Sequence, residues 1–189
     1  MALAALIAAA LLTTAPPAHA APALRLAQAD ADAPHITGST PENEANAAAL
    51  AAGEDPFPPG APTDDYGLVA WCYGALSRHM ELRINAWPEV ERIEREIPEP
   101  GVPLSEVLAS YDQQEKAGQA ELDLYARALS LAEVAHAEGT AERGVLVQKG
   151  RDAWKGADAL DAKALAPSWM SWALPGRCGA TARRILGEK

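Results

Sequence analysis

The sequence predicts an all-α fold: a small irregular bundle of four or five helices with one disulfide, preceded by a flexible Ala/Pro/acidic tail. Three observations support this fold class. Ala, Leu and Glu are abundant whereas Phe occurs once, a composition that favours helix over sheet. Apolar residues recur at helical spacing over residues 64–189. The chain has only two cysteines, Cys72 and Cys178, and each falls in a helical pattern.

Residues 1–20 have the features of a signal peptide. They carry no charge, and an apolar run over residues 2–12 precedes Ala18-His19-Ala20, which fits an A-x-A cleavage site. The run is shorter than the roughly 20 apolar residues that span a membrane. No Lys or Arg precedes it, so either the true start lies upstream or the amino terminus alone supplies the positive charge. The alternative, an Ala-rich disordered tail, leaves the cleavage site unexplained. We expect a periplasmic protein, with secretion into the medium as the alternative.

Residues 21–63 are expected to form a flexible, acidic, Pro-rich tail, because their apolar residues show no sustained period. A short helix over residues 41–52, with Thr40 as its N-cap, is the exception. Residues 56–62 are typical of an extended polyproline-type strap. Either Phe57 docks on the domain or the strap is a Pro-rich ligand for a partner, and we favour docking or plain spacing.

The helical domain, residues 64–189, is expected to begin with a helix capped by Thr63 or Asp64. Pro88 should kink or restart this helix, because proline disfavours helical geometry at the residue before it. A charged helical segment then continues to Ile97. The predicted inward positions are Val69, Cys72, Tyr73, Leu76, Met80 and Ile84, followed by Val90, Ile93 and Ile97.

Further helices are predicted over residues 104–138, 140–160 and 177–186, with a short helix over residues 168–174 before the last. Three glycines interrupt the second of these segments: Gly144, Gly150 and Gly156. They either weaken it by roughly 1 kcal/mol each or allow close contact with a neighbouring helix.

Cys72 and Cys178 are both predicted to point inward, one from the first helix of the domain and one from the last. Two inward cysteines on neighbouring helices of an exported protein favour a disulfide over two buried free thiols. Closing so long a loop should stabilise the fold by about 4–5 kcal/mol in the chain-entropy model.

The formal net charge of −10 is not offset by any basic stripe. Binding to nucleic acid and to anionic membrane surfaces is therefore disfavoured. No stretch after residue 20 is apolar enough to span a bilayer, so we expect no integral membrane segment after signal cleavage.

No motif assigns a catalytic, cofactor-binding or metal-binding residue. The sequence has no C-x-x-C, G-x-S-x-G or H-E-x-x-H and no phosphate-binding Gly-rich loop. His79 and His136 would form a metal site only if carboxylates converged on both, and their spacing shows no such arrangement. The carboxylates between Glu89 and Glu96 are expected to form a solvated helix face rather than a glycosidase-like pair. We therefore predict no cofactor and favour a binding protein over an enzyme.

Aromatic residues are a more informative signal than the histidines and carboxylates, because the chain has five tryptophans and one Phe. Trp169 and Trp172 share a helix face, and such rings either fill the core of an Ala-rich bundle or anchor a partner. We favour the core for the cluster as a whole and keep Trp169 and Trp172 as candidates for a partner surface.

Three functions remain open at this point. The first is an exported soluble protein with a non-catalytic binding or envelope-maintenance role, acting on an unknown protein partner in the cell envelope. The second is an enzyme or small-ligand binder with a site assembled between helices, which a deep pocket joining His79 or Arg78 to several carboxylates would favour. The third and weaker one is a periplasmic metal or haem carrier that uses His79, Met80 or Met170.

Overall fold

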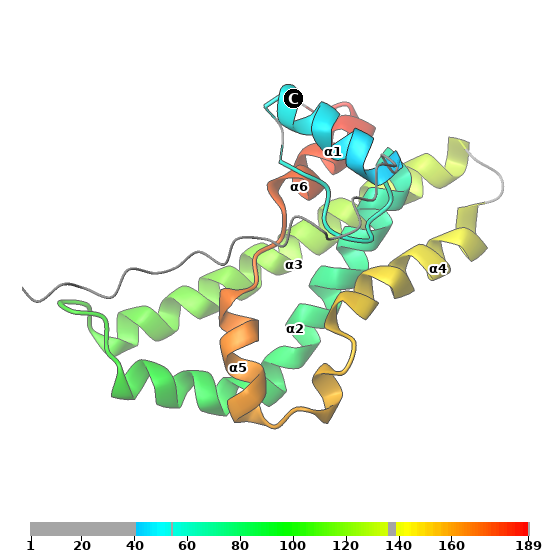
Figure 1. Ribbon diagram of the computed structural model, residues 1–189. Helices are drawn as coiled ribbons and strands as arrows, with labels where there is room; N and C mark the ends of the chain where they lie inside the picture. The colour runs from blue at the N-terminus through cyan, green and yellow to red at the C-terminus, as the bar shows by residue number, and fades with distance from the viewer. Residues whose placement is uncertain (1–40, 54, 136–138, 189) are drawn as a thin grey trace, which may run out of the picture. The chain divides into compact units, whose positions relative to one another are not determined.

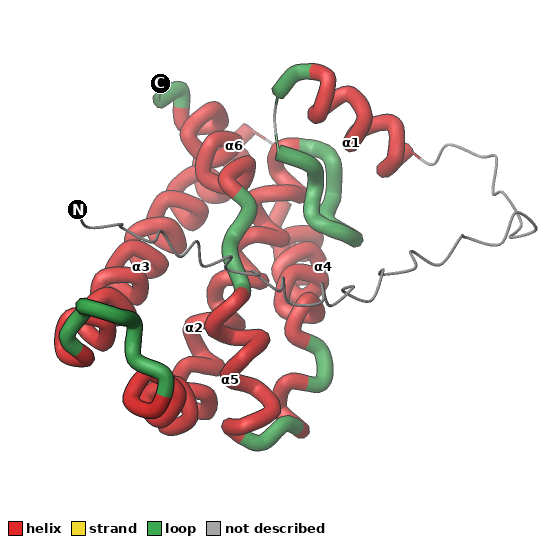
Figure 2. Tube along the Cα trace, turned by 60° about the vertical axis from the view of Figure 1, so that its left-hand side comes forward, coloured by secondary structure: helices red, strands yellow, loops and turns green. Residues whose placement is uncertain are grey.

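The computed structural model describes residues 41–53, 55–135 and 139–188. Over these ranges helices are joined by loops and no strand is present (Figures 1 and 2), which confirms the all-α class. The α-helices are α1 (Pro41–Ala51), α2 (Asp65–Glu96), α3 (Leu104–Ala135), α4 (Gly139–Arg151), α5 (Ala162–Ser171) and α6 (Gly176–Leu186). The expected signal peptide, Thr40 and His136 lie outside the described residues.

Helix α2 is the central element, because α3, α4, α5 and α6 all pack against it. It begins at Asp64, whose side chain accepts a hydrogen bond from the Gly67 backbone N–H at 2.7 Å, as an N-cap does. The helix does not restart at Pro88 but runs through it to Glu96. Figure 1 shows α2 bending in its C-terminal part, as expected where a proline removes one backbone hydrogen bond.

The buried face of α2 is not one stripe, and two of the predicted inward residues are wrong. Ile84 is 80% exposed and Ile97 is 73% exposed. The first half of α2 packs on α3 and α6, whereas the second half packs on α5, so the buried face changes along the helix. Leu82, Ala86 and Val90 are fully buried in that second half.

Helices α2 and α4 approach closely because each carries a glycine at the contact. A Cβ atom at Gly74 would collide with the carbonyl group of Val147, and one at Gly150 with the carbonyl group of Trp71. This confirms for Gly150 that a glycine in the predicted 140–160 helix allows close contact. The helix itself is shorter than predicted. It ends at Arg151 and gives way to short 3₁₀ turns separated by Gly156, whose φ of 87° suits glycine.

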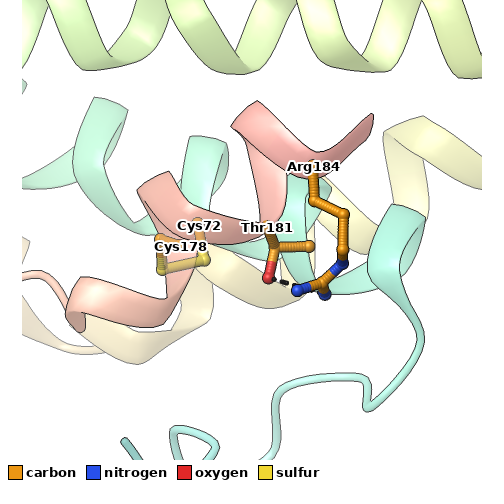
Figure 3. Close-up of a disulfide and its surroundings, with 4 residues drawn as sticks. All are labelled: Cys72, Cys178, Thr181 and Arg184. Carbon is orange, nitrogen blue, oxygen red and sulfur yellow. Dashed lines mark hydrogen bonds between the residues drawn. A yellow bond between two sulfur atoms is a disulfide. The ribbon is translucent and has the colours of Figure 1, made fainter. Parts of the chain in front are cut away.

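Cys72 of α2 and Cys178 of α6 form the predicted disulfide (Figure 3). Their Cα atoms are 6.0 Å apart, within the usual range for a disulfide, and both residues are fully buried. Beside the disulfide, Arg184 donates a hydrogen bond to the Thr181 hydroxyl at 3.3 Å (Figure 3). It also donates a hydrogen bond to the Asp65 carboxylate at 2.6 Å. The covalent bond and this ion pair both hold α6 against the start of α2.

The segment before α2 packs on the helices. The guanidinium of Arg177 lies over the Phe57 ring, 4.0 Å from its centroid, and Ala61 is buried in the core. The expected docking of Phe57 is therefore confirmed. The boundary at residue 63 between a flexible tail and the domain stays a prediction.

Helix α5 differs from the predicted short helix over residues 168–174. It begins at Ala162, where the Asp161 side chain accepts a hydrogen bond from the Ala164 backbone N–H at 2.8 Å, and it contains Pro167 in its interior. It ends at Ser171, and a non-helical link over residues 172–175 leads to α6 (Figure 2). This link and α5 place the tryptophans described next.

Candidate functional site

A cavity of about 150 Å³, here called the aromatic pocket, lies between α2, α3, α5 and the link that follows α5. Its size is close to that of an engineered protein cavity of about 150 Å³ that binds benzene. The lining side chains come from α2 (Leu76, His79, Met80 and Arg83), from α3 (Tyr111, Gln114, Glu115 and Gly118), from α5 (Trp169) and from the link (Trp172 and Leu174). The wall is mostly aromatic and aliphatic, with a few polar groups, as in other small-molecule sites.

The α2 side of the pocket follows from helical spacing. His79 and Arg83 are four residues apart, so their side chains are neighbours on one face of the helix. Leu76 and Met80 adjoin them on the same surface of α2. One turn of helix thus supplies an imidazole, a thioether and a guanidinium to the same cavity.

The imidazole of His79 lies among indole rings. Its centroid is 4.8 Å from that of Trp169 and 4.5 Å from that of Trp172, both stacked, and 5.4 Å from that of Trp154 in a tilted arrangement. In addition, the Trp169 Nε1–H donates a hydrogen bond to the backbone carbonyl of His79 at 2.9 Å. These contacts fix the position of the imidazole ring.

His79 is held neutral. Burial lowers the pKa of its imidazole from 6.5 to about 4, because a charged ring would lose its hydration there. A neutral imidazole has one nitrogen that donates and one that accepts. The Nδ1 atom is buried and has no hydrogen-bond partner among the described residues. A buried polar atom without a partner costs roughly 1–3 kcal/mol.

Arg83 is the charged group of the pocket, and its terminal nitrogens are already paired. Its Nη1 lies 2.6 Å from a Glu115 carboxylate oxygen and its Nη2 lies 2.9 Å from an Asp112 carboxylate oxygen. The guanidinium also lies over the Trp87 ring, 4.5 Å from its centroid. Its Nε is buried and finds no hydrogen-bond partner within the part of the chain that the structure describes.

Tyr111 supplies a ring to the pocket and directs its hydroxyl elsewhere. The hydroxyl donates a hydrogen bond to a Glu94 carboxylate oxygen at 2.5 Å. Burial and this carboxylate raise the pKa of Tyr111, so the phenol stays protonated at neutral pH. The ring lies roughly parallel to that of Trp169, with 6.2 Å between centroids.

The partner-surface candidates Trp169 and Trp172 both line the aromatic pocket. Trp169 is only 6% exposed and Trp172 is half-buried. Trp169 therefore does not supply the exposed patch on which the partner hypothesis relies. The sequence-based reasoning did not identify Arg83 and Tyr111 as site residues. The His79-x-x-x-Arg83 spacing was the available signal for Arg83, whereas no local pattern marked Tyr111.

Other candidates lie outside the pocket. Arg78 forms ion pairs with Asp158 and, at 3.0 Å, with Glu81. Met170 packs in the hydrophobic cluster around Leu165. Within residues 41–53, 55–135 and 139–188, no group of three or more His, Cys, Asp or Glu side chains is placed to hold a metal ion.

The carboxylates of the second half of α2 form ion pairs along the helix surface. Glu89 lies 2.6 Å from Arg92 and Glu91 lies 2.7 Å from Arg95. This agrees with the predicted solvated face. Among the described helices, none is long and apolar enough to cross a membrane.

No protein-family model matches this chain, and neither does any curated protein or any solved structure.

Proposed function

We propose that this chain is an exported, non-catalytic helical protein that binds a small molecule in the aromatic pocket. The observation that carries the proposal is the half-buried His79 imidazole, which is stacked on indole rings at a cavity of about 150 Å³. Its Nδ1 atom is buried and has no hydrogen-bond partner among the described residues. Apolar walls with a few fixed polar groups are the usual composition of a ligand site. This is the ligand-binding form of the second function that the sequence leaves open.

The ionisable groups of the pocket support binding over catalysis. An efficient general acid or base has a pKa near the working pH. Burial holds the pKa of His79 at about 4, so its proton affinity is low at neutral pH. The carboxylate of Glu115 is engaged by Arg83, and the hydroxyl of Tyr111 is engaged by Glu94. These groups serve to shape the pocket and to orient a ligand.

The proposed location is the periplasm, with secretion into the medium as the alternative. A disulfide between two buried cysteines supports a compartment outside the reducing cytoplasm. The A-x-A pattern at Ala18-His19-Ala20 supports the same location from the sequence.

Binding to a protein of the cell envelope is a second candidate. Large apolar side chains are exposed near the facing ends of α3 and α4: Val134 is 88% exposed, Val145 is 60% exposed and Leu131 is 49% exposed. Exposed apolar groups of this kind occur at protein interfaces. A metal carrier has less support, because only His79 and Met80 of its three proposed ligands line the aromatic pocket.

Filling the aromatic pocket tests the main proposal. Gly118 lines the pocket, and a Cβ atom there would lie 3.1 Å from the Met80 Sδ, so a Gly118→Leu side chain would occupy the cavity. Gly144→Leu is the matched control, because a Cβ atom at Gly144 meets nothing within 4 Å. Both changes remove a helical glycine.

The measurement is titration with phenol, a single-ring probe, followed by tryptophan fluorescence and by the indole N–H resonances. We expect saturable binding to the wild type and to Gly144→Leu, and a loss of at least tenfold in affinity for Gly118→Leu. Equal responses from all three proteins would show that the probe does not bind in the aromatic pocket, and the proposal would then be rejected.

A further inference from the structure

We infer that the aromatic pocket selects a neutral, planar, single-ring ligand with a hydrogen-bond-accepting oxygen on its edge, and that the Arg83 Nε–H is the donor to that oxygen. This inference rests on the proposed function and specifies its ligand. The size of the cavity, its charge balance and the polar atoms that lack a partner among the described residues support it.

Size and wall shape favour one flat ring. A cavity of about 150 Å³ is near the volume that holds benzene in an engineered protein and is well below the 300–1,000 Å³ of drug-sized sites. The rings of His79 and Trp169 are inclined by only 9°, and those of Tyr111 and Trp169 by 25°. These rings pack against one another, with 4.8 Å and 6.2 Å between centroids, so they form a continuous aromatic wall on which a planar ring can pack.

The charge balance favours a neutral ligand. The positive charge of Arg83 is already offset by Glu115 at 2.6 Å and Asp112 at 2.9 Å, and His79 is uncharged at neutral pH. A carboxylate ligand would therefore meet the Glu115 carboxylate in the pocket wall, in a chain with a formal net charge of −10. An ammonium ligand would instead meet the guanidinium in the wall. Desolvating either ion without a partner is costly.

The unpartnered atoms favour an acceptor oxygen. The Nε of arginine only donates, and in Arg83 it is buried with no hydrogen-bond partner among the described side chains and backbone groups. A hydroxyl or carbonyl oxygen at that position would complete the guanidinium's hydrogen bonding. His79 Nδ1 donates or accepts according to its tautomer, so it tolerates either group beside it. A ring without any oxygen would leave both atoms unpaired.

The test compares three rings of similar size at pH 7: phenol, toluene and benzoate. Dissociation constants are measured from the indole N–H resonances of the full wild-type protein. We expect phenol to bind about tenfold more tightly than toluene, because a hydrogen bond from a charged donor outweighs the extra apolar surface of the methyl group. Benzoate is expected to bind most weakly of the three.

Arg83→Lys checks the residue assignment. Lysine keeps the positive charge beside Asp112 and Glu115 but lacks the Nε–H at that position. The affinity for phenol should fall about tenfold towards that for toluene, while the affinity for toluene stays unchanged. Arg95→Lys is the matched control, because Arg95 lies on the exposed surface of α2 in an ion pair with Glu91. If Arg83→Lys does not fold, the affinities of the wild-type protein for phenol, toluene and benzoate still test the inferred ligand preference.

The outcomes separate the two proposals. Equal affinities for phenol and toluene, or tightest binding of benzoate, would overturn the inference about Arg83 and leave a ring-binding pocket. If none of the three rings binds in the millimolar range, both the inference and the proposed function are overturned.

Discussion

The imidazole of His79 and the indole of Trp169 are tied to each other in two ways. Their rings stack at an angle of 9° with 4.8 Å between centroids, and the Trp169 Nε1–H donates to the His79 backbone carbonyl at 2.9 Å. The contact joins α2 to α5, two helices far apart in the sequence. It fixes one wall of the aromatic pocket before any ligand enters, which lowers the ordering cost of binding.

The buried imidazole predicts a pH dependence of stability. His79 has a pKa of about 4 in the folded protein and about 6.5 when unfolded, so the unfolded state takes up the proton first as the pH falls. The contribution of neutral His79 to the free energy of unfolding is complete above pH 6.5 and is lost between pH 6.5 and 4. The total loss is roughly 3 kcal/mol. Urea unfolding at a series of pH values measures it.

His79→Phe, which keeps a stacking ring but cannot take up a proton, is the control for this pH dependence of the free energy of unfolding. Its free energy of unfolding should change less than that of the wild type between pH 6.5 and 4. A second decline, below about pH 4.5, should remain in both proteins, because hydrogen bonds from Arg151 and Arg78 hold the pKa of Glu81 at about 2. If the free energy of unfolding changed with pH equally in the wild type and in His79→Phe above about pH 4.5, burial of the His79 ring would be contradicted.

The close crossing of α2 and α4 predicts opposite effects for two glycines of α4. Gly150→Ala should destabilise by about 2 kcal/mol or more, because its Cβ would collide with the carbonyl group of Trp71. Gly144→Ala should stabilise by up to about 1 kcal/mol, because that position is open and helical. Thermal unfolding of both variants compares them, and a stable Gly150→Ala protein would show that the helices are further apart.

Leu82 and Ile84, two aliphatic residues of α2, test whether the buried face of this helix changes along its length. Leu82 is fully buried whereas Ile84 is 80% exposed. Leu82→Ala should cost about 2–5 kcal/mol, whereas Ile84→Ala should change the free energy of unfolding by less than about 0.5 kcal/mol. Chemical denaturation measures both. The reverse order would support the single straight stripe that the sequence predicts.

Removal of the disulfide should destabilise the fold without changing its helices. The double variant Cys72→Ala/Cys178→Ala opens a loop with a sequence separation of 106 residues, and we expect a loss of about 4–5 kcal/mol from the chain-entropy model. Far-UV circular dichroism should be unchanged at low temperature, while the Tm falls. An unchanged Tm would mean that the two thiols are not joined in the native protein.

The sequence predicted most helices because helix formation depends on residues close together in the chain. It predicted the disulfide because the chain has only two cysteines. Helical periodicity located α2, α3 and α6, and the pair Cys72 and Cys178 allowed only one intramolecular disulfide. The start of α5 was missed because the helix was predicted to begin only after Pro167, at Ser168, whereas Asp161 caps it and burial of Leu165 stabilises it.

The aromatic pocket could not be predicted from the sequence. His79, Tyr111 and Trp169 lie on three helices, and their distances depend on how those helices cross. Periodicity reports which face of a helix is apolar but not which helix covers it. For the same reason helical periodicity placed Ile84 inside, although none of the described helices covers that side of α2.

The central claim is that a single-ring molecule binds within the aromatic pocket, and the most direct measurement is an isotope-filtered NOE spectrum of the labelled protein with phenol. We predict intermolecular NOEs from the phenol ring protons to the side chains of Met80, Trp169 and Trp172. NOEs confined to exposed side chains such as Val134 and Val145, or none at saturating phenol, would contradict the account.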